Sequence, residues 1–399
     1  MSDLFLARNQ VAIAGFAHSP VVRRSAEPLG ITALHTARAA IADAGLTVAD
    51  IDGFCSSALL PSSGDHSARD GVTTVTSDWL AQHLGGEPKY VAGFQGIGQL
   101  TGSLTLAVNA LASGACDYVL LHRALSSPMG KYNDNAMTKA GGMHQWGAPQ
   151  GFFGALTPMA MSYNEYCQRY GATREAMAHV VVEARKNGAR LPWSYWYEKP
   201  LTVEQYLAEP MICDPMSRLD CDIPVHGVGV FILTRAERAK DLPNKPVYIS
   251  GYANAYPRHN RLPLHWTLDD MEEAGRAQAA RLWAKSGLGP KDIDLPQVYD
   301  AFSPYVYLWL EALGFCPRGE AHRFVLDGGI DSDKPGSLPV LSGGGAIGNG
   351  RLHGLPQLLE CYLQLSGRAG ARQRQVNTAM FTYSAPNFGG SMVLVGDPS

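Results

Sequence analysis

The sequence predicts an α/β protein made of two similar halves. Apolar runs typical of buried strands alternate with segments of helical spacing, a pattern that favours helices layered on a sheet with largely parallel central strands. A short motif also occurs twice, at Gly45 and at Gly287: Gly-Leu, a short linker and then Asp-Ile-Asp before the next apolar run. The two copies are about 240 residues apart, which is too far for a solenoid repeat and suits a duplicated domain. We therefore assign residues 1–242 to the first half and 243–399 to the second.

Composition excludes several classes of protein. The chain has 399 residues, 46% apolar and 17% charged, with a net charge of −3, as in an ordinary globular protein that binds no nucleic acid. No apolar run reaches the roughly 18 residues of a membrane span, and the start of the chain lacks a signal-peptide pattern. Its seven cysteines are an odd number without a CxxC pair, which favours reduced thiols over disulfides or a zinc site. We expect a cytoplasmic protein without a metal.

The first half opens with a buried strand at residues 11–16 and a helix at 31–44 that Gly45 ends. A Gly-rich loop at 93–98 leads into a helix that extends to about Ser113. A strand at 118–121 and a closing strand at 227–233 complete this half.

Between those last two strands lies a large loop insertion, about residues 123–226. It contains a Gly/Met/Asn-rich segment at 129–154 and a helical pair whose second helix Thr173 can cap. An aromatic cluster follows at 192–197. Aromatic residues beside a Gly-rich segment suit either a lid over an apolar substrate or a subunit interface, and the sequence favours neither.

In the second half, strands at 247–252 and 389–395 mirror the first and closing strands of the first half. A second Gly-rich loop, residues 342–354, contains six glycines in thirteen residues and three polar side chains, Asn349, Arg351 and His353. So many glycines suit a loop whose backbone approaches a ligand, or a tight turn whose glycines serve packing. Helical spacing begins at Leu355, so the loop leads into a helix N-terminus, which favours anions.

The duplicated βαβαβ halves, the Gly-rich loops and the insertion together resemble the thiolase superfamily over essentially the whole chain. Residues 298–303, Val-Tyr-Asp-Ala-Phe-Ser, resemble the family's Asn-Glu-Ala-Phe motif, and residues 344–350 resemble the loop that carries its Gly-His-Pro motif. Residues 208–215 with Asp220 and Cys221 resemble, more weakly, the sterol-carrier-protein type of thiolase. The resemblance implies a five-layered αβαβα arrangement.

The departures from the thiolase pattern concern its catalytic groups. The nucleophilic cysteine would fall near Ile97, but no cysteine or serine occurs between residues 93 and 102. Arg351 replaces the histidine of Gly-His-Pro, and the second catalytic cysteine, expected before the Gly389-Gly390 pair, is missing. The chain therefore cannot form an acyl-enzyme at these positions.

A Tyr-Asp-x-Phe-Ser motif with a Gly-x-x-His-Gly loop and no cysteine is similar to the thiolase-like aldolases of steroid side-chain degradation. This resemblance implies retro-aldol cleavage of a β-hydroxyacyl-CoA with a bulky apolar, steroid-like acyl chain. Coenzyme A would enter as part of the substrate, with no separate cofactor. A small OB-fold partner of the DUF35 type would join the enzyme. The alternatives are a non-catalytic subunit that binds acyl-CoA or lipid, and an acyltransferase or decarboxylase on the same fold.

We assign three catalytic candidates: Tyr299, Arg351 and His353. Tyr299 ends an apolar strand in the resembling motif, but a phenol with a pKa of about 10 needs a nearby cation to act as a base, and Arg351 is available. His353 is the better base near neutral pH. The sequence leaves open which of the three accepts the proton.

Most of the proposed substrate-binding residues could instead have a purely structural role. The backbone N–H groups of two pairs, Ile97 with Gly98 and Gly389 with Gly390, could form oxyanion holes, or these residues could serve close packing. Further candidates are Asp300, Ser303 and Asn349. Asp300 could instead cap the following helix, and Asn349 could donate to a thioester carbonyl.

The resemblance also implies a homodimer. It places the strand at 118–121 at a sheet edge, where an apolar strand pairs with its copy across a two-fold axis. Copies of the OB-fold partner would dock near the insertion. The alternative is a monomer whose insertion covers that edge.

Overall fold

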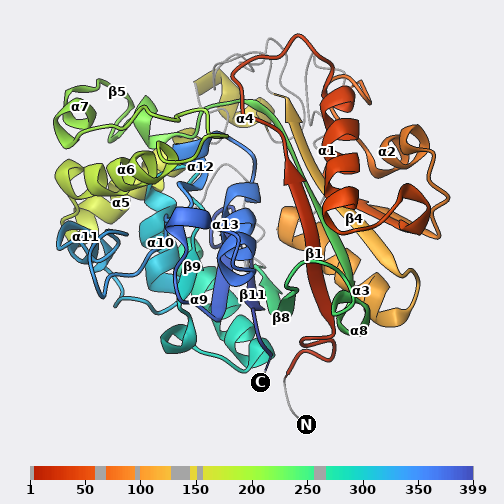
Figure 1. Cartoon of the computed structure of the whole chain (residues 1–399). Helices are drawn as coiled ribbons and strands as arrows, with labels where there is room; N and C mark the ends of the chain where they lie inside the picture. Colours follow the sequence, from red (N-terminus) through yellow and green to blue (C-terminus); the bar gives the residue numbers. More distant parts are fainter. Residues whose placement is uncertain are drawn as a thin grey trace.

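The computed structural model describes residues 4–58, 69–94, 99–126, 144–150, 156–255 and 267–398 (Figure 1). A nine-stranded sheet runs through both halves in the order β3-β2-β4-β7-β1-β8-β11-β10-β9. Its strands are β1 (Val11–His18), β2 (Gly53–Ser56), β3 (Tyr90–Gly93), β4 (Tyr118–Ser126), β7 (His226–Arg235), β8 (Val247–Asn254), β9 (Leu295–Gln297), β10 (Thr378–Tyr383) and β11 (Gly390–Val395). A two-stranded sheet, β5 (Met211–Cys213) and β6 (Met216–Ser217), lies in the insertion.

Strand pairing shows the duplication. In the first half β1 pairs antiparallel with β7, β7 antiparallel with β4, and β4 parallel with β2. In the second half β8, β11, β10 and β9 repeat that order and those directions. The halves join where Ala12 and Ile13 of β1 pair with Tyr248 and Val247 of β8. The predicted duplicated α/β fold is therefore confirmed.

The expectation of largely parallel central strands is wrong. Only the pairs β2–β3, β2–β4 and β9–β10 are parallel among the described strands, and every pair from β4 across to β10 is antiparallel. For β10 and β11 the physical reason is the short connection. Residues 384–389 between β10 and β11 are too few for a crossover, and a short turn makes neighbouring strands antiparallel.

The predicted edge strand is also misplaced. β4, which contains residues 118–121, lies between β2 and β7 and is hydrogen-bonded on both sides. The edge of the first half is β3, because the chain adds β3 outside β2 before the helix that returns to β4. Any pairing across this edge must therefore use β3.

The part of the sheet in each half forms one β layer, and helices lie outside both parts and between them, which gives five layers, αβαβα. Helices α1 (Leu29–Asp43) and α2 (Ser77–Leu84) cover the outer face of the first half, on the right in Figure 1. The middle layer contains α3 (Gln99–Ser113) and α13 (Leu355–Leu365), whose apolar residues share one core with strands of both halves. Helices α9 (Leu268–Ser286) and α10 (Pro304–Ala312) cover the second half on the left.

The insertion packs on the second half through α5 (Leu156–Tyr170), α6 (Arg174–Gly188) and α7 (Val203–Ala208). The Thr173 side chain accepts a bond from Ala176 N and caps α6, as predicted. Helix α6 packs closely on α12 (Gly345–Asn349), because a Cβ at Gly188 would lie 1.9 Å from the carbonyl oxygen of Gly348. Most of the predicted Gly/Met/Asn-rich segment lies outside the described residues.

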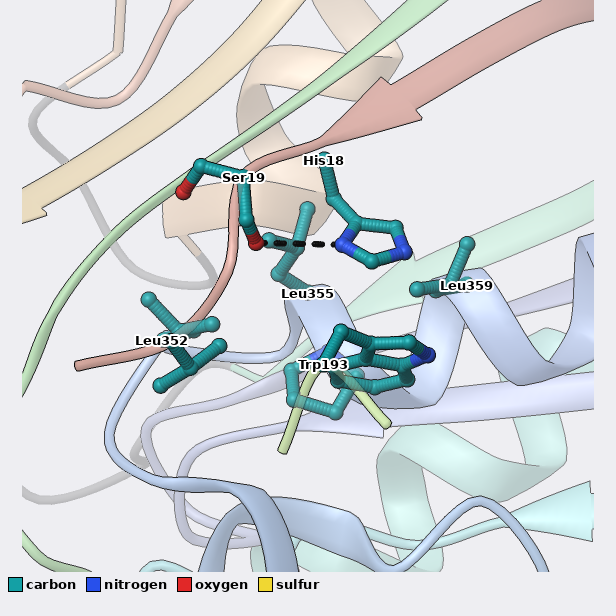
Figure 2. Close-up of a pocket in the computed structure, with 8 residues that line it drawn as sticks. His18, Ser19, Trp193, Leu352, Leu355 and Leu359 are labelled. Carbon is teal, nitrogen blue, oxygen red and sulfur yellow. Dashed lines mark hydrogen bonds between the residues drawn. The ribbon is translucent and has the colours of Figure 1, made fainter. Parts of the chain in front are cut away.

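The aromatic cluster at 192–197 does not stand free as a lid. Trp193 and Tyr195 are partly buried against the central core, and the Ser194 hydroxyl donates to the carbonyl of Gly348 at 2.7 Å. Figure 2 shows Trp193 beside His18 and Leu352 in a small pocket between the end of β1 and the start of α13. The cluster therefore supports the Gly-rich loop from the side of β1.

Two further features concern the whole chain. All seven cysteines are free thiols, as the sequence predicted. Among the described helices none combines the length and the apolar character that a membrane crossing needs.

Candidate active site

A strained turn brings one catalytic candidate into the middle layer. His353 has a φ of +50° and Gly354, just before α13, a φ of +85°, so two successive residues are left-handed. A non-glycine residue in this region costs about 1–3 kcal/mol and persists only where its surroundings enforce it. Here the turn places the imidazole against β10, with ring centroids of His353 and Tyr383 6.1 Å apart.

The side chain that meets His353 is Arg123 of β4, which is only 1% exposed. Its Nη2 donates to His353 Nδ1 at 2.5 Å and to Gln99 Oε1 at 3.3 Å, and its Nη1 donates to Ser57 Oγ at 3.1 Å. Within the described part of the chain Arg123 forms no salt bridge. A buried cation with neutral partners is unfavourable for folding, which marks a functional position.

Sequence reasoning missed Arg123. Its signal was present, because Arg123 is an arginine inside a largely apolar strand that is buried everywhere except at its two ends. Alternation places Val119, Leu121 and Leu125 in the central core, and Arg123 shares that face of the strand. Nothing in the sequence, however, indicated that this face meets the second Gly-rich loop.

Two tyrosines line the same site. Tyr299 is 4% exposed, its backbone N donates to Thr382 Oγ1 at 2.8 Å, and its ring centroid lies 5.0 Å from that of Tyr383. The positive charge of Arg123 interacts favourably with the ionised forms of both phenols. The sequence named Arg351 as the cation for Tyr299; the structure adds Arg123, which sequence reasoning did not find.

Tyr383 serves as a hydrogen-bond donor. Its hydroxyl donates to Gln99 Oε1 at 2.7 Å. Burial raises the pKa of Tyr383 to about 12, although the nearby charges of Arg123 and Arg351 act in the opposite direction. Tyr383 therefore stays protonated at neutral pH. It was not among the predicted residues.

Arg351 is held at the rim of the site. Its backbone N donates to the carbonyl of Ile223 at 2.8 Å, and its Nε lies 4.0 Å from Oδ1 of the buried Asp222. Its positive charge lowers the pKa of both His353 and Tyr383. Of the three predicted residues, Arg351 acts on His353, and Arg123 interacts with both His353 and Tyr299 and so connects those two.

The expectation that His353 titrates near neutral pH is wrong. Burial, and then the charges of Arg123 and Arg351, lower the pKa of His353 well below its ordinary value of 6.5. The imidazole is therefore neutral at pH 7, because protonation would place a positive charge on a partly buried ring beside the charges of Arg123 and Arg351. His353 is not a base that exchanges protons with solvent in this range.

Asp300 caps a helix, but not the one expected: it caps α12, which is distant in the sequence, and not the helix that follows it, α10. Its carboxylate accepts bonds from Ala346 N at 2.5 Å, from Ile347 N at 3.1 Å and from Gln357 Nε2 at 2.9 Å. These bonds fix α12, which carries the Gly-rich loop, so the residue acts on the site through the loop. Complete burial raises the pKa of Asp300 to about 7, although the backbone bonds from Ala346 and Ile347 lower it.

This pKa predicts a pH dependence of stability. Because the pKa of Asp300 is above its ordinary 3.8, the folded state binds more protons than the unfolded state between about pH 4 and pH 7. Stability should therefore fall as pH rises through that window. Urea unfolding across the window should show a flatter slope for Asp300→Asn, whereas the exposed control Asp78→Asn should keep the wild-type slope. Equal slopes for both variants would contradict this role.

Ser303 and Asn349 are buried, and both donate hydrogen bonds to other parts of the protein, which favours a structural role. The Ser303 hydroxyl donates to Asp220 Oδ1 at 2.6 Å. The Asn349 amide donates to the carbonyls of Gly343 and Gly345 at 2.6 and 2.7 Å and closes the loop. Their polar groups were read as site donors because the sequence cannot show that their partners lie within the fold.

Of the two glycine-containing pairs predicted to form oxyanion holes, the structure describes only Gly389 with Gly390. A Cβ at Gly389 would lie 2.0 Å from the carbonyl oxygen of Tyr383, and one at Gly390 would lie 1.9 Å from Thr101 Oγ1. Close packing of β11 on α3 and β10 thus accounts for these glycines, the alternative that the sequence left open. Ile97 and Gly98 lie outside the described residues.

Comparisons with known proteins agree with this geometry. The family model described as thiolase C-terminal domain-like matches residues 263–394. The chain is 31% identical to a steroid side-chain-cleaving aldolase of Thermomonospora curvata, with 93% of this chain and 94% of that protein covered. The chain belongs to the thiolase superfamily.

Two further relatives indicate the branch of the superfamily. A 17-hydroxy-3-oxo-4-pregnene-20-carboxyl-CoA lyase of Mycobacterium tuberculosis is 30% identical, with 90% of this chain and 92% of that protein covered. The solved structure of an Ltp2-ChsH2(DUF35) aldolase superposes with a TM-score of 0.82 at 29% identity and covers 98% of each chain. The predicted resemblance to the thiolase-like aldolases is thereby confirmed.

Another cysteine could in principle replace the missing thiolase nucleophile. Among the described cysteines, Cys221 interacts electrostatically with Arg351 and is 8% exposed. Burial, with the charges of Asp220 and Asp222, raises the pKa of its thiol well above the ordinary 9.0. A thiol that stays protonated is a poor nucleophile, so Cys221 does not replace the missing catalytic cysteine.

Proposed function

We propose that this protein is an aldolase, a carbon–carbon lyase that cleaves a β-hydroxyacyl-CoA with a bulky apolar acyl chain of the steroid class. The observation that carries the proposal is the cluster of the buried Tyr299, Tyr383 and Arg123 with the partly buried His353, in which no described cysteine acts as a thiolate nucleophile. Two relatives, 31% and 30% identical, are named as a steroid side-chain-cleaving aldolase and a 17-hydroxy-3-oxo-4-pregnene-20-carboxyl-CoA lyase, respectively.

The cluster supplies what a retro-aldol step requires. Tyr299 accepts the proton of the β-hydroxyl, the bond between the α and β carbons breaks, and its electron pair moves to the thioester carbonyl as an enolate. The β carbon leaves as a ketone or aldehyde, and protonation of the α carbon gives the shortened acyl-CoA. Arg123 favours both the phenolate and the enolate, because its charge is buried and lacks an acidic partner among the described residues.

Coenzyme A enters this scheme as part of the substrate, and we propose no separate cofactor. Each step is a proton transfer or a bond cleavage, and the carbon atoms undergo no net oxidation. The positive charge of Arg351, with its side chain 23% exposed at the rim, suits the thioester end of the substrate.

The test is incubation of purified protein with a panel of β-hydroxyacyl-CoAs of increasing acyl size, with and without a DUF35-type partner. We expect a ketone or aldehyde and a shortened acyl-CoA in equal amounts, detected by mass spectrometry. Calorimetry that shows acyl-CoA binding without turnover would favour the non-catalytic subunit. Release of CO₂ would indicate a decarboxylase.

Acyl transfer makes a different prediction, which Cys221→Ala tests. We expect this variant to keep wild-type turnover within about twofold, because the buried thiol stays protonated and forms no acyl-enzyme. Cys361→Ala is the matched control, since Cys361 is also a buried free cysteine but lies in α13. Loss of turnover only in Cys221→Ala, together with a covalent acyl adduct on intact protein, would favour the acyltransferase.

We further propose a cytoplasmic homodimer joined by an OB-fold partner of the DUF35 type. The partner is suggested by the Ltp2-ChsH2(DUF35) aldolase structure, in which such a protein accompanies a similar chain. The dimer is suggested by β3, an edge strand whose Val91 is 36% exposed and whose outer side has no neighbouring strand among those described. Light scattering should give about twice the chain mass of 42.9 kDa, and a monomer mass would contradict the dimer.

A further inference from the structure

The contact with Arg123 determines which ring nitrogen of His353 carries the proton. A guanidinium carries only hydrogen-bond donors, so the nitrogen that it contacts must offer a lone pair. Arg123 Nη2 lies 2.5 Å from His353 Nδ1, and therefore Nδ1 is the acceptor. A neutral imidazole with an unprotonated Nδ1 carries its proton on Nε2.

We propose that Arg123, in addition to the effect of its charge, positions His353: it holds the ring as the neutral tautomer protonated on Nε2, so that this N–H donates to the oxygen that gains negative charge. The assignment of that oxygen to a thioester enolate rests on the proposed function. The tautomer itself does not.

The neutral state follows from the groups that surround the ring. Arg123 of β4 and Arg351 of the same loop both act against a positive imidazolium, and burial acts in the same direction. Among the described residues His353 makes no ion pair with an acidic group. The ring is therefore a fixed donor and not a proton acceptor, which leaves proton acceptance to Tyr299.

The position of Arg123 is itself fixed from two other sides. Ser57, after β2, accepts from Nη1, and Gln99 at the start of α3 accepts from Nη2. The same Gln99 oxygen accepts from the Tyr383 hydroxyl. One side chain thus ties the histidine of the second half to two elements of the first half.

The electrostatic surroundings argue against a purely structural role. Arg123 lies beside residues at the N-termini of α3 and α13, where helix dipoles already disfavour a cation. Three unfavourable conditions coincide: burial, helix N-termini and the absence of an acidic partner among the described residues. An anion that forms in the site would be stabilised by the buried charge and by the helix N-termini, and it would supply the missing negative partner, as expected for a catalytic position.

The experiment is nitrogen NMR of protein labelled with ¹⁵N-histidine, with His353→Asn used to assign the signal. In the wild type we expect the pattern of a neutral ring with the proton on Nε2. In Arg123→Met, which keeps the stem but removes the donors, we expect a mixture of tautomers. Arg123→Lys, which keeps the charge and a donor, should restore part of the wild-type pattern.

Turnover gives the second readout. We expect kcat of Arg123→Met to fall at least about 10-fold, within the roughly 10⁴-fold that a wrong histidine tautomer costs a serine protease, while KM changes little. Arg123→Lys should recover part of that loss.

Wild-type protein that shows His353 protonated on Nδ1, or doubly protonated, would overturn the proposal, as would Arg123→Met with an unchanged tautomer. If Arg123→Met does not fold, the wild-type spectrum still decides the tautomer. If no acyl-CoA is cleaved, the proposed function fails while the spectrum tests the tautomer independently.

Discussion

Replacing Tyr299 by phenylalanine should lower kcat for retro-aldol cleavage by about 10²–10⁴-fold, because the variant loses the group that accepts the β-hydroxyl proton. The ring should stay in place, since it packs between Tyr383 and Tyr305 at centroid distances of 5.0 and 6.3 Å. Substrate affinity should therefore change little. Single-turnover kinetics with the best substrate of the panel, together with calorimetry, would separate the two effects.

The matched control is Tyr307→Phe. Tyr307 is also a buried tyrosine of the same region, in α10, but its hydroxyl has no hydrogen-bond partner among the described residues. Removing that hydroxyl should leave turnover and stability close to the wild type. Turnover that survives Tyr299→Phe would remove Tyr299 from the mechanism and make another group the proton acceptor.

Asp220→Ala should destabilise the fold by about 3–5 kcal/mol, the largest stability loss that we expect. The buried carboxylate of Asp220 accepts bonds from the hydroxyls of Tyr206, Ser217 and Ser303 at 2.7, 2.8 and 2.6 Å. It also accepts from the backbone N of Ser217 at 2.7 Å. Alanine would leave these buried donors without their acceptor. Urea unfolding monitored by circular dichroism measures the loss.

This substitution should affect the site as well as the fold. Asp220 joins the insertion, through Tyr206 of α7, to Ser303, four residues after Tyr299. Turnover at a temperature where the variant remains folded should therefore also fall. The exposed control Asp241→Ala should change stability by less than about 0.5 kcal/mol. Equal stability of the two variants would contradict the role of Asp220 as a structural link.

The site differs from its sequence-based description in one consistent way. Polar residues inside a motif were read as groups that face the substrate, yet Asp300, Ser303 and Asn349 face other parts of the protein. A short-range motif shows that a buried polar group exists. It does not show whether that group's partner is a ligand or another segment, because the partner lies far away in the sequence.

The sequence by itself determined the duplicated α/β fold and the absence of a thiolase nucleophile at the motif positions. Periodicity, glycine placement and the repeat at Gly45 and Gly287 are local properties, so the order of the residues records them directly. Residue identity is equally local, and a missing cysteine needs no coordinates. Tyr299, Arg351 and His353 were found because they lie inside recognisable motifs.

Only the tertiary structure decided the strand directions, the edge strand and the protonation of the site. β4 became an interior strand because β3 adds outside β2, a choice that depends on packing between segments. Arg123 and His353 are 230 positions apart in the chain and meet at 2.5 Å. The pKa and tautomer of His353 depend on that contact and on burial. Both are long-range properties, because they arise only when the two halves pack together in the folded protein.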